Sequence, residues 1–164
     1  MLKPIRRTRT SKTTARFAIV ASEYNSRFVN AMLRKARQVL RQAGARDVQV
    51  LRVPGAFEIP AVAARLLQAP GEKPAAVICL GVILQGETSH ARMIAESVSF
   101  ALAQLQVIHA IPVIHGVLWF DNARQAQVRC LGRTHNRGAE AATTALAMAR
   151  VMIRMQGLPN HGRS

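Results

Sequence analysis

The chain has 164 residues, of which 49% are hydrophobic, and its 23 lysines and arginines outweigh eight acidic residues to give a net charge of +15. This length and composition predict one globular domain, and no apolar run reaches the roughly 20 residues of a membrane-spanning helix. The N-terminus lacks the apolar stretch of a secretory signal, and the two cysteines lack metal-ligand spacing, so we expect a cytoplasmic protein without a metal site.

Strand-like and helix-like segments alternate along the chain. Asn25 or Ser26 can cap the first helix, and Gly44 can end it. Alternation of this kind predicts a three-layer α/β/α sandwich with a four-stranded parallel sheet, of the flavodoxin-like class. In chain order we expect a strand at 17–22, a helix at 26–43, a strand at 48–53, a short helix at 58–67, a strand at 75–80, a helix at 90–105, a strand at 111–118, a short helix at 122–130 and a helix at 138–155.

Charge is concentrated at the N-terminus, where residues 1–16 hold six basic residues and no acidic one. We expect a flexible basic tail at 1–15, a single domain at 16–158 and a flexible C-terminal tail at 159–164. Binding to RNA, DNA or a membrane is the alternative interpretation of such charge. None of the few aromatic residues lies in the basic tail, which argues against a dedicated nucleic-acid module.

Polar, glycine-containing segments follow the expected strands, at 23–25, 54–58, 85–90 and 116–122. Ligands of open α/β sheets bind beyond the carboxyl ends of the strands, so these segments predict one site. Within the third segment, a Gly-Glu-Thr turn at a helix start offers free N–H groups to an anion. His90 follows two residues later and can move protons beside a bound phosphate.

Four motifs together resemble the 6,7-dimethyl-8-ribityllumazine synthase family. They are Val53-Pro-Gly-Ala-Phe-Glu-Ile-Pro60, Gly81 with Gly86-Glu-Thr-Ser-His90, Pro112-Val-Ile-His-Gly-Val-Leu118, and the run from Gln125 through Arg129 to Asn136-Arg-Gly-Ala-Glu-Ala-Ala142. The match runs in register over residues 17–152. The first two motifs at this spacing are highly specific in combination.

The resemblance implies a transferase that condenses 5-amino-6-(D-ribitylamino)uracil with 3,4-dihydroxy-2-butanone 4-phosphate, releasing phosphate and water, in the penultimate step of riboflavin biosynthesis. It implies no metal and no organic cofactor. His90 would transfer protons, and Arg129 would reach the phosphate from a neighbouring subunit. The residues that the resemblance implies for substrate binding are Tyr24, Asn25, Ala56, Phe57, Glu58, Ile83, Leu84, Gly86, Glu87, Thr88, His115 and Arg129.

The resemblance also implies that the chain assembles into pentamers. These occur singly, in pairs as decamers, or in shells of sixty subunits. The expected partners are therefore small-molecule substrates and further copies of the chain, without a membrane, and the lack of aromatic residues in the basic tail disfavours nucleic acid. Some positions depart from the family pattern: His115 stands where phenylalanine is usual, Gln85 where arginine is common, and Tyr24 for phenylalanine. His115 is titratable, so it can alter ring affinity or pH dependence.

Other interpretations stay open beside this one. Glu58 can simply favour a helix N-terminus, and Arg129 can be a solvated arginine. A ligand carrier that keeps the pocket but has lost catalysis would bind lumazine or flavin without turnover. A basic shell that packages nucleic acid would copurify with it and release it at high salt.

Overall fold

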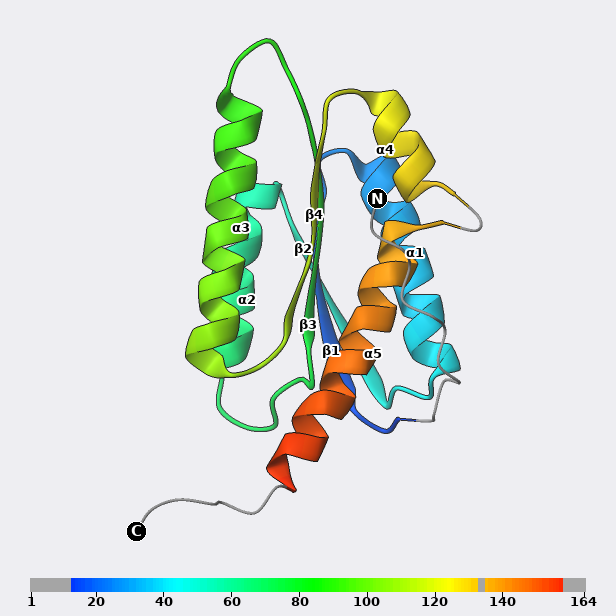
Figure 1. Ribbon diagram of the computed structural model, residues 1–164, viewed down its shortest axis with the longest axis vertical. Helices are drawn as coiled ribbons and strands as arrows, with labels where there is room; N and C mark the ends of the chain where they lie inside the picture. Colours follow the sequence, from blue (N-terminus) through cyan, green and yellow to red (C-terminus); the bar gives the residue numbers. More distant parts are fainter. Residues whose placement is uncertain (1–12, 133–134, 158–164) are drawn as a thin grey trace.

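The computed structural model describes residues 13–132 and 135–157, which form a four-stranded sheet with helices on both faces (Figure 1). The strand order is β2-β1-β3-β4, and every neighbouring pair is parallel. The strands are β1 (Arg16–Ser22), β2 (Asp47–Val53), β3 (Val77–Leu84) and β4 (Val113–Phe120). The predicted fold class, a flavodoxin-like α/β/α sandwich with a four-stranded parallel sheet, is confirmed.

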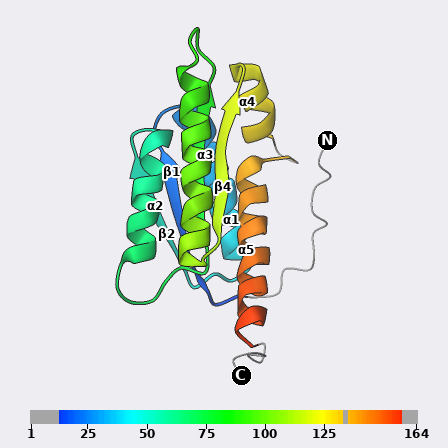
Figure 2. The same ribbon diagram turned by 60° about the vertical axis from the view of Figure 1, so that its left-hand side comes forward.

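The helices form two layers, one on each face of the sheet (Figure 1). One layer consists of α1 (Ser26–Gln42), α4 (Ala123–Cys130) and α5 (Arg137–Gln156), and the other of α2 (Ile59–Gln68) and α3 (His90–His109). A short 3-10 helix, η1 (Ala56–Glu58), leads into α2. The edge strand β4 lies between α3 and α5 when the molecule is turned (Figure 2).

The core is divided by the sheet into two apolar clusters. Successive side chains of a strand point to opposite faces, so Ile78 and Leu80 pack against the layer of α1, α4 and α5, whereas Val77 and Cys79 pack against α2 and α3. Burial on both faces explains why β3 is a continuous apolar run, whereas the edge strand β2 alternates between exposed and half-buried residues over most of its length.

The prediction for β3 was wrong at both ends, because the strand begins at Val77 and continues to Leu84. Gly81 lies beyond the strand expected at 75–80, but it pairs with Val117 of β4. A Cβ at this glycine would lie 3.2 Å from Ile59 Cδ1 and 3.3 Å from Val117 Cγ1. The glycine therefore marks close packing of α2 against the sheet, which the sequence pattern does not distinguish from a strand end.

Helix α1 begins at Ser26 as expected, but the side chain of Asn25 does not cap it. Asn25 precedes the helix with a left-handed φ of 55° and makes no side-chain cap. Its Nδ2 instead donates to the Val82 carbonyl at 2.8 Å, so this side chain joins β1 to β3. The expected end of the helix is confirmed: Gly44 has a φ of 82° and its N–H bonds the Arg41 carbonyl at 2.9 Å.

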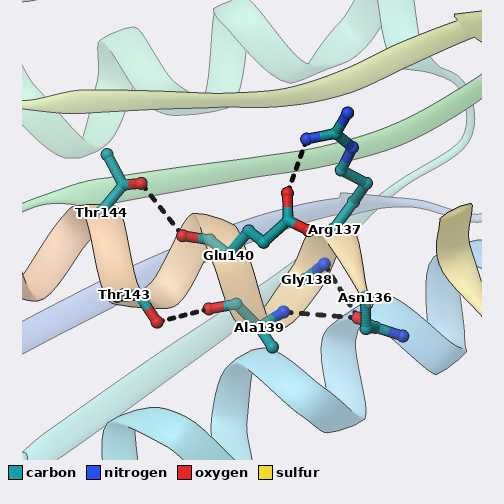
Figure 3. Close-up of polar contacts among 7 residues, drawn as sticks. All are labelled: Asn136, Arg137, Gly138, Ala139, Glu140, Thr143 and Thr144. Carbon is teal, nitrogen blue, oxygen red and sulfur yellow. Dashed lines mark hydrogen bonds and ion pairs between the residues drawn. The ribbon is translucent and has the colours of Figure 1, made fainter. Parts of the chain in front are cut away.

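Asn136 organises the start of α5 (Figure 3). Its Oδ1 accepts from the N–H groups of Gly138 at 2.9 Å and Ala139 at 3.3 Å, and its Nδ2 donates to the Cys130 carbonyl at the end of α4. The side chain is buried, so water cannot replace these bonds. One amide therefore connects two helices.

Replacing Asn136 by alanine should lower the free energy of unfolding by about 2 kcal/mol, because two helix N–H groups and one buried carbonyl lose their partner. Urea unfolding followed by circular dichroism measures this loss. The matched control is Asn122→Ala, since Asn122 caps α4 through one bond to the Gln125 N–H at 3.0 Å but is exposed. Equal losses in the two variants would contradict the importance of burial.

The ends of the chain fall largely outside the described residues, as do most of the expected tails at 1–15 and 159–164. Within the described part, Thr13 donates its N–H to the Ala43 carbonyl at 2.7 Å, and Ala15 accepts from the Arg46 N–H at 3.1 Å. None of the described helices combines the length and the apolar character that a membrane crossing requires.

Candidate functional site

Loops with candidate residues meet at the carboxyl ends of the strands, toward the upper end of Figure 1. The loop after β1 carries Tyr24 and Asn25, η1 follows β2, and the turn 85–89 follows β3. This placement follows from parallel strands, whose carboxyl ends all lie at one edge of the sheet.

The loop of Tyr24 is bonded to the loop after β2. The Tyr24 N–H donates to the Pro54 carbonyl at 3.0 Å, and the Glu23 N–H donates to the Val53 carbonyl at 2.8 Å. Gly55 lies under the Tyr24 ring, because a Cβ there would be 3.1 Å from Cδ2. The ring itself is 69% exposed and presents a large flat surface to a ligand or a partner.

Glu58 has a local structural partner. One oxygen, Oε2, accepts from the Gly55 N–H at 2.8 Å, in the manner of a capping acid at the start of η1. The neighbouring Phe57 is 59% exposed and Ala56 is buried. The second carboxylate oxygen has no hydrogen bond among the described residues, so Glu58 can hold its loop and still accept from a ligand.

The turn at residues 86–89 is held by Gln85. Gln85 Nε2 donates to the carbonyls of Gly86 at 2.7 Å and Thr88 at 2.8 Å, and its Oε1 accepts from Trp119 Nε1 at 3.1 Å. An indole nitrogen can only donate, which fixes the orientation of the amide. Two carbonyls of the turn thus face Gln85.

The N–H groups of the same turn stay free. No hydrogen bond found among the described residues uses the backbone N–H of Gly86, Glu87 or Thr88, and all three residues are exposed. These groups precede α3, whose N-terminal end carries a partial positive charge. The turn can therefore take up an anion.

His90 is the first residue of α3 and is exposed. Its backbone N–H donates to Thr88 Oγ1 at 3.4 Å, whereas its ring has no hydrogen bond or ion pair in the described part of the chain. The imidazole is thus free to exchange a proton with a ligand bound at the turn.

His115 is oriented by a residue that sequence reasoning missed. Its Nε2 lies 2.8 Å from Ser99 Oγ, and Ser99 Oγ donates its own proton to the Ala95 carbonyl at 2.6 Å. The serine therefore accepts from His115, which places a proton on Nε2 and leaves Nδ1 open. Nothing in the sequence around Ser99 indicated that it would contact His115. The two-residue period of β4, by contrast, does place His115 and Trp119 on the same face of the sheet.

The remaining predicted residues do not all come together. Ile83 is buried in the cluster of α2 and α3 with Ala56, but Leu84 packs on the opposite face. Arg129 lies on α4, across the sheet from α3, and no hydrogen bond or ion pair in the described residues joins it to the turn. It lines a groove of about 610 Å³ beside α4, together with Phe120, Asn122, Arg124, Gln125 and Val128.

Neither cysteine is placed for chemistry. Cys79 and Cys130 are buried and free, and burial raises the pKa of Cys79 to about 12 and that of Cys130 to about 11. Both remain protonated near neutral pH and pack as small apolar groups. Among the described residues no three His, Cys, Asp or Glu side chains gather as metal ligands would.

Comparison with known proteins identifies relatives over most of the chain. The sequence model of the 6,7-dimethyl-8-ribityllumazine synthase family matches residues 14–153. A 6,7-dimethyl-8-ribityllumazine synthase of Xanthomonas campestris pv. campestris (strain B100) is 39% identical over 85% of this chain and 91% of its own length. A 6,7-dimethyl-8-ribityllumazine synthase of Stenotrophomonas maltophilia (strain R551-3) is 38% identical over 85% of this chain and 90% of its own length.

Proposed function

Because the chain belongs to the 6,7-dimethyl-8-ribityllumazine synthase family of transferases, we propose that it condenses 5-amino-6-(D-ribitylamino)uracil with 3,4-dihydroxy-2-butanone 4-phosphate in riboflavin biosynthesis. The products are 6,7-dimethyl-8-ribityllumazine, phosphate and water, and this is the penultimate step of that pathway. The observation that carries the proposal is the turn 86–89, with free N–H groups and an unengaged imidazole directly after it. A cytoplasmic location fits the two free cysteines.

In this mechanism the turn binds the phosphate of the butanone. Gly86, Glu87 and Thr88 offer backbone N–H groups, and the start of α3 favours the negative charge as phosphate departs. Formation of the imine between amine and ketone, loss of phosphate and ring closure each require proton transfer. His90 stands at the turn and supplies it.

The exposed aromatic surface serves the other substrate. Tyr24 would stack on the pyrimidine ring, Phe57 and Glu58 would bind the ring and the ribityl hydroxyls, and Asn25 would lie beside the ribityl chain. The exposure of both aromatic rings and the free oxygen of Glu58 support these roles. Two substrates held side by side gain on the order of 7 kcal/mol from proximity, without a covalent intermediate on the protein.

We propose further that the site is completed by a second copy of the chain in an oligomer of pentamers. Arg129 and His90 lie on opposite faces of the sheet, so one subunit's Arg129 does not serve its own His90. The outer side of α3 supports association, because Met93, Phe100 and Val107 recur every seven residues and are 61%, 66% and 79% exposed. An apolar stripe of this kind is typical of a helix that packs on a partner.

The test is to mix the purified protein with the ribitylaminouracil and the butanone phosphate and to follow lumazine absorbance and fluorescence. The slow reaction without protein gives the baseline. Product formed well above that baseline supports the enzyme. A rate at the baseline, with tight lumazine binding, would overturn the proposal in favour of a ligand carrier.

Replacing Arg129 by alanine should raise the KM for the butanone phosphate about 10- to 100-fold, because a charge-assisted hydrogen bond contributes about 1.5–3 kcal/mol. The KM for the uracil should change far less. Steady-state kinetics with each substrate varied in turn measures both constants. Arg124→Ala on the same helix is the control, and equal effects of Arg129→Ala on the two substrates would indicate a structural role.

A further inference from the structure

Basic side chains are distributed unequally between the two helical layers. The helices α1, α4 and α5 carry ten basic residues and one acidic residue, whereas α2 and α3 carry two basic residues and one acidic residue. Half of the ten lie on α1, which has no acidic residue at all. The positive charge of the helices is therefore gathered on one face of the sheet.

Four arginines of α1 form a stripe along the helix. Arg27, Arg34 and Arg41 recur every seven residues, and Arg37 lies on the same side between the last two. At 1.5 Å per residue the stripe is about 21 Å long. A groove of about 270 Å³ follows it, lined by Arg34, Arg37, Gln38, Arg41 and Gln42.

A fifth arginine adds to this surface from the sheet. Arg52, near the end of β2, donates from Nη1 to Asn30 Oδ1 at 2.9 Å, and Asn30 lies on the same side of α1 as Arg27 and Arg34. We refer to Arg27, Arg34, Arg37, Arg41 and Arg52 as the arginine face.

The arginine face is not neutralised within the described chain. None of the ion pairs found there includes any of its five members, and Arg37 Nε is buried without a hydrogen-bond partner. Guanidinium groups spaced at one or two helical turns repel one another at distances comparable to the Debye length. Such a surface is favourable only toward an anionic partner.

We propose that the arginine face binds the sugar–phosphate backbone of duplex nucleic acid without regard to sequence. Guanidinium forks match phosphate oxygens in geometry, and Gln38 and Gln42 supply neutral hydrogen bonds beside them. A strand of a duplex advances 3.4 Å per phosphate, so the stripe faces about six phosphates of one strand. The repeating charge of the helix thus meets a repeating charge of opposite sign.

Other anionic partners fit the surface less well. A second copy of the chain offers only eight acidic residues, no two of them adjacent in sequence. A membrane surface would call for apolar side chains to insert, but arginine and glutamine alone line the groove. Single strands bind chiefly by base stacking, and the only aromatic residue of α1, Phe28, is buried.

The proposal does not depend on the proposed catalytic activity. The arginine face belongs to the layer of α1, across the sheet from α3 and His90. No member of the arginine face is among the predicted substrate-binding residues. Loss of duplex binding and loss of lumazine formation are therefore separate outcomes.

The test measures binding of the full-length protein to a labelled duplex of about 24 base pairs by fluorescence anisotropy, between roughly 50 and 300 mM salt. The triple variant Arg34→Gln, Arg37→Gln, Arg41→Gln should bind at least about tenfold more weakly near 100 mM salt. The negative slope of log binding constant against log salt concentration should be smaller in magnitude by about 2 to 3, because each lost phosphate contact removes about 0.9 from it.

The control triple variant is Arg46→Gln, Arg65→Gln, Arg92→Gln, which loses the same charge from exposed positions outside the arginine face. It should bind within about threefold of the unaltered chain. Equal weakening by both triple variants would overturn the proposal, because net charge alone would then explain the binding. Tighter binding to polyglutamate or to anionic vesicles than to the duplex would overturn it as well.

Folding of the triple variant is checked by circular dichroism. If burial of Arg37 Nε makes the triple variant unstable, the double variant Arg34→Gln, Arg41→Gln replaces it, because both of these arginines are exposed. The slope of log binding constant against log salt concentration should then fall in magnitude by about 1.8, since two phosphate contacts are lost.

Discussion

Replacing Gly138 by alanine should destabilise the fold by about 3 kcal/mol or more, or prevent folding. Gly138 is in the first turn of α5, where the helix crosses α1. A Cβ at this position would lie 2.0 Å from the Met32 carbonyl oxygen and 2.5 Å from Met32 Cα. These are backbone atoms of a packed helix, so they cannot rotate away as a side chain would.

Separation of the two helices is the only relief, and it would open the cluster between α1, α5 and the sheet. The midpoint of urea unfolding measures the effect. Gly157→Ala is the control at the other end of α5, where a Cβ would lie 3.7 Å from the Arg154 carbonyl oxygen, an ordinary van der Waals distance. That variant should change stability by less than about 0.5 kcal/mol, and a similar small loss in Gly138→Ala would contradict the close contact.

Replacing His90 by alanine should slow turnover by about 10- to 100-fold, at or below the usual contribution of a general acid or base. The ring is exposed and has no partner in the described chain, so its loss should leave the fold unchanged. Steady-state assays with both substrates saturating isolate the effect on kcat.

The matched control is His109→Ala, because His109 is the last residue of α3, at the end of the helix farthest from the turn. Calorimetric titration with inorganic phosphate shows whether the turn still binds its anion in each variant. A rate equal to that of the unaltered chain would remove His90 from the mechanism, whereas a lost phosphate affinity would assign it to binding.

Much of the architecture could be predicted because the signals are local. Apolar runs and helical spacing gave the sheet and its two layers, and the polar segments after the strands gave the edge where candidate residues meet. Family resemblance then added roles that no spacing supplies. Asn25 occupies the N-cap position without a side-chain cap, and β3 continues past the expected end at Leu80 through Gly81, because tertiary contacts with Val82 and Ile59 decide both positions.

The contacts between distant segments could not be predicted. Trp119 and Gln85 are 34 residues apart, and Ser99 and His115 are 16 apart, so each pair depends on how β4 lies beside β3 and α3. Net charge is visible in the sequence, but its concentration on one layer is not, since that depends on which helices share a face.

The hydrogen bond from Trp119 to Gln85 means that the intrinsic fluorescence of the protein can report on the turn at 86–89. The chain has a single tryptophan, and its indole N–H ends on the amide that holds the turn 86–89. Emission from that one chromophore is sensitive to the polarity and hydrogen bonding around it. Rearrangement of the turn is therefore coupled to an intrinsic spectral signal, without any label and without background from a second indole.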